Sequence, residues 1–242
     1  MTQPAINGSP TVVTLNNASG GVRAHAFSTG TLTSPAGLLL VPWESSADRS
    51  TGFTTGGGGA TWIGGGAMTY VGGIAVNVTA QGLYAGIAAF VLPGIASSAS
   101  GNVTVTNSAE AGLFMGAWIA AYDNTHQTTP TASFVTGSSA TSSLTPSIAV
   151  TSTTNDRALG LAFMMNVPLG GVSAGSGDTA VGGIINEAAS YTDARGLVVE
   201  NAGTNPTLDW TFTGSDGGVW LAFSLKGTGA AGTQFRILYT QA

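Results

Sequence analysis

Polar and apolar residues alternate along several short segments of the chain. The segment 207–213 places three large apolar side chains on one face: Leu208, Trp210 and Phe212. Segments 219–225 and 102–106 alternate in the same way. A period of two residues is that of a β-strand with one buried face and one outer face. The pattern therefore predicts strands, with Trp210 in the core and Trp220 on the face opposite to its two apolar neighbours.

A second group of segments is apolar at nearly every position. These segments are 37–43, 83–92, 113–122 and 159–167. We expect them in the middle of sheets, or where a second surface covers their outer face. Turn sequences such as Pro93-Gly94 and Asn155-Asp156 separate the strands, and helix-forming Glu, Lys and Arg are scarce. Many short strands with such turns predict an all-β fold, an antiparallel jelly-roll-like β-sandwich.

Three segments differ from the rest of the chain. Residues 1–20 are polar and contain Pro4 and Pro10, which predicts an extended N-terminal arm. Residues 45–66 contain two glycine runs and are expected to form a long loop. Residues 227–242 follow a Gly/Ala/Thr hinge and are expected to form a short C-terminal extension. The expected sandwich domain therefore covers residues 21–226, and either terminal segment can add a strand to the sheet of a neighbouring subunit.

The charge content is unusually low for a chain of this length. Only 7% of the 242 residues are charged, with a net charge of −5 and a mean hydropathy of +0.29, whereas soluble proteins average about 25% charged residues. The absence of Cys excludes a disulfide scaffold and thiolate chemistry. Six basic residues against 11 acidic ones argue against nucleic-acid binding.

Neutral outer faces favour contacts between protein surfaces. Ser, Thr, Gly, Ala and Asn occupy the outer positions of the predicted strands, and such faces can be dehydrated without burying an unpaired charge. We therefore expect assembly with copies of the same chain or with a larger particle. A secreted or adhesive β-domain with a neutral surface is the alternative.

The sequence predicts neither a membrane span nor a secretory signal. The most apolar stretches, 83–95 and 111–122, are shorter than the roughly 20 residues that a spanning helix needs. Residues 1–4 lack the charged and apolar regions of a signal peptide.

Candidate catalytic and metal-binding patterns are weak. His25 and His126 lie in no metal-ligand motif. The segment Gly171–Gly175 matches G-x-S-x-G, but no helix signal and no His follows it, as a hydrolase would require. Glu44 and Asp209 both adjoin a Trp, yet sequence neighbours point to opposite faces of a strand, so a glycosidase pair is disfavoured. We expect no cofactor, no metal and no enzyme activity.

Two tryptophans are candidates for an interface or a glycan contact. Trp62 lies in the predicted glycine-rich loop, and Trp220 lies on the outer face of its strand. Tryptophan is enriched at protein interfaces because its large ring is apolar and its N–H is polar.

The order of several motifs resembles a family of phage and prophage-encoded β-sandwich proteins. The motifs are Gly65-Gly-Ala-Met-Thr-Tyr-Val71, the segment 83–92 with Pro93-Gly94, Gly101-Asn-Val-Thr-Val-Thr-Asn-Ser108, Asp123 with Thr128-Thr-Pro130, 147–152 with Asn155-Asp156, and Asp209-Trp-Thr211 with 220–226. The resemblance covers roughly residues 60–226. It implies a virion component: a decoration, fibre or tail-associated module without catalytic residues.

These observations lead to one expected function and one alternative. The expected function is that of a structural protein in a phage-like virion, whose partners are other copies of itself and other virion proteins. The alternative is a carbohydrate-binding or receptor-binding module for a host-surface glycan, in which Trp62 and Trp220 make the contacts.

Overall fold

The computed structural model describes residues 2–16, 22–33, 35–46, 59–62, 66–106, 112–168, 171–189 and 192–228, and every regular element within these ranges is a β-strand. The first nine strands are β1 (Ala5–Asn16), β2 (Val22–Ser28), β3 (Ala36–Ser46), β4 (Gly59–Trp62), β5 (Gly66–Ala67), β6 (Thr69–Val78), β7 (Leu83–Pro93), β8 (Ser100–Thr106) and β9 (Gly112–Asp123). The next nine are β10 (Thr131–Ser139), β11 (Ser147–Ala149), β12 (Arg157–Met165), β13 (Val172–Ala174), β14 (Thr179–Ala180), β15 (Ile185–Ala189), β16 (Thr192–Asn201), β17 (Thr207–Phe212) and β18 (Gly217–Leu225). The expected all-β, antiparallel class is confirmed.

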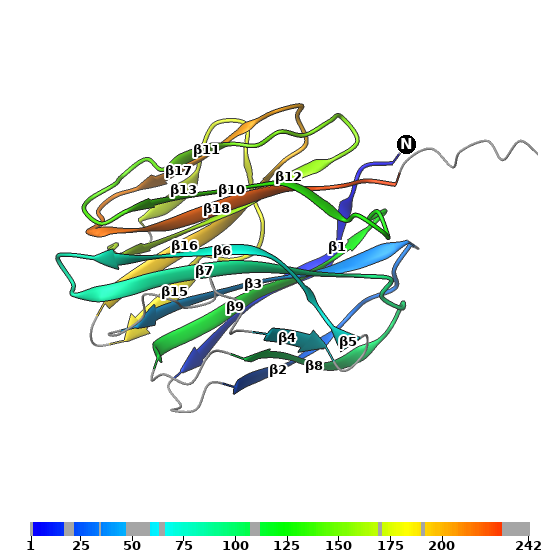
Figure 1. Ribbon diagram of the computed structural model, residues 1–242, viewed down its shortest axis with the longest axis horizontal. Coiled ribbons are helices and arrows are strands. Elements are labelled where there is room, and N and C mark those ends of the chain that lie inside the picture. The colour runs from blue at the N-terminus through cyan, green and yellow to red at the C-terminus, as the bar shows by residue number, and fades with distance from the viewer. Residues whose placement is uncertain are drawn as a thin grey trace, which may run out of the picture.

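The strands form four sheets stacked in layers (Figure 1). The two outer sheets have the orders β2-β8-β4-β5 and β11-β17-β13. The two central sheets have the orders β1-β9-β3-β7-β6 and β10-β18-β12-β16-β14, and β15 also pairs with β16. The four sheets include β1, which lies before the expected sandwich of residues 21–226.

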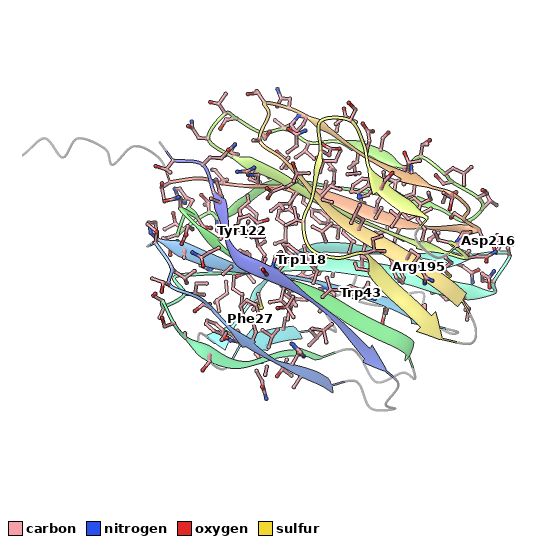
Figure 2. All side chains as sticks on the ribbon, turned by 180° about the vertical axis from the view of Figure 1, so that it is seen from behind. Phe27, Trp43, Trp118, Tyr122, Arg195 and Asp216 are labelled. Atoms are coloured by element: carbon pink, nitrogen blue, oxygen red, sulfur yellow. The ribbon has the colours of Figure 1, made fainter. Side chains whose placement is uncertain are left out.

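Three hydrophobic cores separate the four layers. One lies between the first outer sheet and its central sheet, and includes Phe27 and Trp62. The second lies between the two central sheets and includes Trp43, Trp118 and Phe163; Figure 2 shows Trp43 and Trp118 in this layer and Phe27 in the layer next to it. The third lies under the second outer sheet. Each central sheet is thus covered on both faces.

This layering explains the segments that are apolar at every position. They form β3, β7, β9 and β12 inside the two central sheets. Strand β12 is buried at every position after Arg157, and the expectation that a second surface covers these strands is confirmed. The alternating segment 207–213 contains β17 of an outer sheet, where every second residue is buried and Trp210 is fully buried.

The terminal segments differ in part from the expected arm and extension. Residues 5–16, within the expected arm 1–20, form the edge strand β1, which pairs with β9. Of the extension 227–242, Gly227 and Thr228 are described, and Thr228 bridges Thr2; residues 229–242 lie outside the described ranges. The expected loop 45–66 contains β4 at residues 59–62, where Trp62 anchors the strand in the core.

The second nine strands repeat the order of the first nine. In the N-terminal half, residues 2–123, the central sheet has the order β1-β9-β3-β7-β6. Adding nine to each number gives β10-β18-β12-β16-β15, which are the pairings observed in the C-terminal half, residues 131–225. The outer sheets correspond in the same way, as β2-β8-β4 and β11-β17-β13. The two halves differ at β14, which pairs with β16, whereas β5 pairs with β4.

Three edge strands of the central sheets carry β-bulges. The register shifts in β1 between Asn7 and Thr11, in β6 between Tyr70 and Gly72, and in β10 between Ala132 and Val135. A left-handed residue lies in two of these bulges: Gly8 in β1, with φ of 73°, and Ser133 in β10, with φ of 54°. A bulge bends its strand and interrupts the ladder. Both halves therefore begin with a strand that is kinked near its start.

Candidate functional site

The charged side chains that the structure describes have low exposure. Every charged residue whose side chain the structure describes is buried or half-buried: Glu44, Asp123, Asp156, Arg157, Asp178, Arg195, Glu200, Asp209, Asp216 and Lys226. Surface charges normally keep a protein of this size in solution. In the described part of the chain, the accessible surface is therefore made almost entirely by neutral residues.

Several of the acids close turns or tie separate segments together. Asp156 accepts hydrogen bonds from the backbone N–H and hydroxyl of Thr153, at 3.0 and 2.9 Å. Asp123 accepts hydrogen bonds from Asn7 Nδ2 at 2.8 Å and from the backbone N–H of Thr33 at 2.6 Å. Asp156 thus acts on its own turn, as Asp commonly does, whereas Asp123 holds two segments that are distant in sequence.

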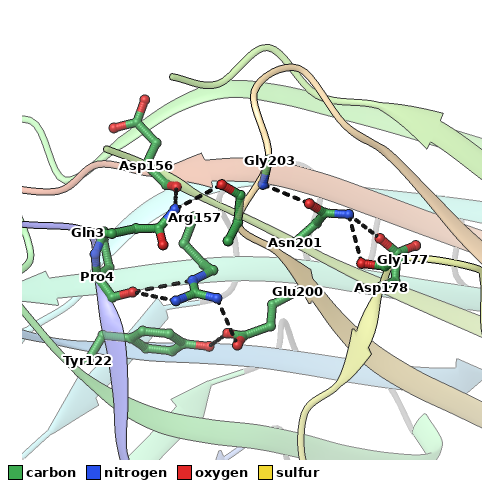
Figure 3. Close-up of polar contacts among 11 residues, drawn as sticks. Gln3, Pro4, Tyr122, Asp156, Arg157, Gly177, Asp178, Glu200, Asn201 and Gly203 are labelled. Atoms are coloured by element: carbon green, nitrogen blue, oxygen red, sulfur yellow. Dashed lines mark hydrogen bonds and ion pairs between the residues drawn. The ribbon is translucent and has the colours of Figure 1, made fainter. Parts of the chain in front are cut away.

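One polar cluster joins the two halves at the end where the N-terminal segment crosses them (Figure 3). Tyr122 on β9 donates a hydrogen bond from its hydroxyl to Glu200 Oε2 on β16 at 3.1 Å. Arg157 on β12 lies 3.2 Å from Glu200 Oε1 through its Nη1. Its Nε and Nη2 both donate to the carbonyl oxygen of Pro4, at 3.2 Å. We call Tyr122, Arg157 and Glu200 the junction cluster.

The environment of the junction cluster favours a neutral Tyr122. The side chain is fully buried between the central sheets. Burial, followed by the nearby Glu200 carboxylate, raises the pKa of Tyr122 well above its usual value of 10.0, and Arg157 opposes this shift. The phenol is therefore a hydrogen-bond donor to a carboxylate that also pairs with a guanidinium. This arrangement holds segments together and gives no activated nucleophile.

Gln3 extends the contacts of the N-terminal segment. Its side-chain Nε2 donates to the carbonyl oxygen of Asp156 (Figure 3) and to that of Ala202. Together with the carbonyl of Pro4, this side chain fastens the segment before β1 to the C-terminal half.

The two tryptophans predicted as contact residues occupy different environments. Trp62 is fully buried in the core beneath the first outer sheet, and its indole Nε1 has no hydrogen-bond partner in the described residues. Trp220 is half-buried on the face of β18 opposite to Val219 and Leu221. Its ring lies over Gly137 of β10, where an added Cβ would be 2.2 Å from the indole Nε1. Trp220 thus remains accessible in part, and Trp62 does not.

The other sequence candidates are not brought together. His25 lies on β2 of an outer sheet, whereas His126 follows β9 and accepts a hydrogen bond from the N–H of Thr129 at 3.1 Å. Glu44 lies on β3 of a central sheet and Asp209 on β17 of an outer sheet. Within the described residues, no three His, Asp or Glu side chains cluster as metal ligands.

The G-x-S-x-G segment forms a strand. Its Ser173 lies in β13, opposite Thr211 of β17. The nucleophile elbow of hydrolases places this Ser on a sharp turn from a strand to a helix, which differs from the backbone seen here.

Sequence reasoning missed the junction cluster. Tyr122 and Arg157 lie at the ends of apolar runs, and Glu200 follows Leu197-Val198-Val199. A charged residue next to an apolar run usually lies at the surface, so these residues gave no direct indication of a buried cluster. The only indication in the sequence was that charged residues are unusually scarce. The described ranges also contain no helix that could cross a lipid bilayer.

Comparison with known proteins found no matching family model, no matching curated protein and no matching solved structure.

Proposed function

We propose that this chain is a structural component of a phage-like virion, a capsid decoration, fibre or tail-associated protein that packs against copies of itself and other virion proteins. The observation that carries this proposal is that no charged side chain in the described part of the chain is fully exposed. Contacts across such a surface bury few ions, and burying an unpaired ion is costly.

The outer sheets provide faces suited to this packing. Among the side chains that the structure describes, their exposed positions carry only small neutral residues: Ala24, Ala26, Ser28, Gly59, Thr61, Gly66, Ala67, Ser100, Asn102, Ser147, Ala149, Ser173, Thr207 and Thr211. Asp209 shares the outer face of β17 but is half-buried beside Gly175. Flat faces of short side chains lose little side-chain entropy when they are covered. Two such faces on opposite sides of the layered stack allow one molecule to contact neighbours on both sides (Figure 1).

The strand order also supports a jelly-roll assignment for the N-terminal half. Without β6, the first half has eight strands, whose sheets read 1-8-3-6 and 2-7-4-5 in chain order. This is the order of a jelly roll, an architecture found in viral capsid proteins and lectins. The resemblance of residues 60–226 to phage-encoded β-sandwich proteins favours the first of these two uses.

The proposal is tested by adding charge to the two outer faces. Asn102→Lys and Thr211→Lys place one cation on each outer sheet, and Asn102→Ser with Thr211→Ser is the neutral control. We expect the natural chain and the control to form multimers in light-scattering and electron-microscopy measurements, and the lysine variant to lose them while keeping its thermal midpoint. A natural chain that stays monomeric at high concentration and binds no particle from the same source contradicts the proposal.

A glycan-binding function is the second candidate, and the partial exposure of Trp220 favours it. Aromatic rings offer an apolar face to sugars and a polar edge to their hydroxyls. Trp220→Ala is expected to abolish binding on a glycan array if this function holds, while Trp62→Ala acts only through stability. An array on which the natural chain binds no glycan excludes this candidate.

A further inference from the structure

We infer that the contact between the two halves is a two-fold, self-complementary interface, so that each half can pair with the same half of a second copy of this chain. The starting point is the repeated strand order, in which β1 to β9 correspond to β10 to β18. In a two-fold interface every contact occurs twice. If element A of one half contacts element B of the other half, then the equivalent of A in the other half contacts the equivalent of B in the first half.

The edge strands meet this condition, whereas the close packing of β18 on β6 and β7 has no equally close counterpart between β9 and β15 or β16. Strand β10 packs on β6, and β1 packs on β15. Strand β10 is the equivalent of β1, and β15 is the equivalent of β6. The contact between β1 and β15 therefore corresponds to the contact between β10 and β6 with the two halves exchanged. The two contacts lie at opposite margins of the core between the central sheets.

The bulged residues make matching contacts at these margins. In β10, the ring of Phe134 lies against Gly72 of β6, where an added Cβ would be 2.3 Å from Phe134 Cε1. In β1, Pro10 lies against Gly182, just before β15, where an added Cβ would be 3.3 Å from Pro10 Cβ. In both cases a ring from the bulge of the first strand of one half rests on a glycine of the other half.

The ends of the two halves pair with each other. Residues 124–126 follow β9 and residues 226–228 follow its equivalent, β18. The N–H of His126 donates to the carbonyl oxygen of Lys226, and the N–H of Thr228 donates to that of Asn124, both at 2.9 Å. These bonds flank the antiparallel bridge between Thr125 and Gly227. Two equivalent segments paired antiparallel in this way are related by a local two-fold axis.

The middle of the core shows the same relation. Trp43 on β3 and Phe163 on β12 come from equivalent strands, and their ring centroids are 6.4 Å apart. A contact between side chains from equivalent strands is expected next to a two-fold axis, where each half meets its own counterpart.

The junction cluster breaks this symmetry and favours pairing of unlike halves. Tyr122 comes from the N-terminal half, whereas Glu200 and Arg157 come from the C-terminal half. Strand β7, the equivalent of β16, has no charged residue. In a pair of two N-terminal halves, the buried Tyr122 hydroxyl would therefore lose its carboxylate partner, and this cost selects the pairing seen within one chain.

The test starts from the folded full chain with a protease site inserted between Thr128 and Thr129, which are exposed in the segment that joins the halves. The cleaved protein keeps every residue. Labelled (¹⁵N) and unlabelled samples are cleaved, mixed, warmed below the unfolding transition and examined by native mass spectrometry. We expect mainly pairs of unlike halves, together with N-terminal pairs and C-terminal pairs that carry both labels. The uncleaved chain is the control and should show no species with the mass of two N-terminal or two C-terminal halves, because each half remains joined to the other.

A second measurement distinguishes self-complementarity from general stickiness. Tyr122→Phe removes the hydroxyl that needs Glu200, so we expect the share of N-terminal pairs to rise about tenfold relative to unlike pairs. Tyr84→Phe on β7, outside the core between the halves, should leave that ratio unchanged. Finding only unlike pairs overturns the inference, as do halves that separate and stay unpaired, or a Tyr122→Phe variant with an unaltered ratio. None of these results depends on whether the intact chain assembles into particles.

Discussion

Replacing Arg157 is expected to weaken the junction between the halves more than any other single change in its cluster. Arg157→Met removes the 3.2 Å ion pair with Glu200 and both hydrogen bonds to the carbonyl oxygen of Pro4. The carboxylate then keeps only the hydroxyl of Tyr122 among the three residues of the cluster. A carboxylate deprived of its cation in a poorly solvated site destabilises the folded state.

The magnitude follows from how well the pair is shielded. The side chains of Arg157 and Glu200 are 19% and 11% exposed, so water screens the pair only in part. Breaking a buried pair costs about 3–5 kcal/mol, and partial exposure places this case near about 3 kcal/mol. Replacing a buried ion pair by apolar side chains of similar volume often leaves the free energy of unfolding unchanged. The triple variant Arg157→Met/Glu200→Leu/Tyr122→Phe should therefore be at least about 1 kcal/mol more stable than Arg157→Met alone.

Urea unfolding measures these differences. Far-ultraviolet circular dichroism gives the midpoint and the slope m, and an unchanged m shows that stability alone has changed. A triple variant that is less stable than Arg157→Met would refute the reasoning, because the loss would then come from packing rather than from a stranded carboxylate.

Three further outcomes are expected. Gly116→Ala should lower the free energy of unfolding by about 1–3 kcal/mol or more, because its Cβ would lie 2.1 Å from an indole carbon; Gly59→Ala, with open space around the Cβ, is the control in the same denaturation assay. The raised pKa of Tyr122 means that the unfolded phenol ionises first, so stability should fall as the pH rises above about 10.0, and less steeply in Tyr122→Phe, in a pH series of melting curves. Trp62→Ala should cost about 3–5 kcal/mol as a large cavity in the core, and Trp220→Ala clearly less, since its ring is half-buried; equal losses in urea would contradict the difference in burial.

Many of the strands could be predicted from the sequence because burial of a strand produces a regular pattern of apolar residues along it. The alternation in 207–213 indicates a strand with one covered face, and continuous apolar runs such as 159–167 indicate strands that are covered on both faces. Strand β1 was missed because Gly8 and Pro10, which usually mark loops, lie in its bulge. Strand β4 was missed because glycines surround its four residues.

The repeat of the two halves could not be derived from sequence similarity. Gly116-Ala-Trp-Ile-Ala120 and Gly218-Val-Trp-Leu-Ala222 look alike, and they lie on the equivalent strands β9 and β18. Yet Trp118 faces the core between the halves, whereas Trp220 lies on the opposite side of its sheet. An alignment that matched these two segments residue by residue would place the side chains of one strand on the wrong face of its sheet. Successive side chains of a strand point to opposite faces, so an error of one residue exchanges the two faces. The junction cluster was equally hidden, since it joins residues from three strands.

The kinks in β1, β6 and β10 restrict how a polymer of this protein can grow. A strand from another molecule needs a straight row of free N–H and C=O groups, and these margins do not offer one. Growth by main-chain pairing is therefore disfavoured at these three margins, which favours contacts in which side chains meet face to face. Such a polymer should come apart in mild denaturant, bind no amyloid dye and return intact subunits.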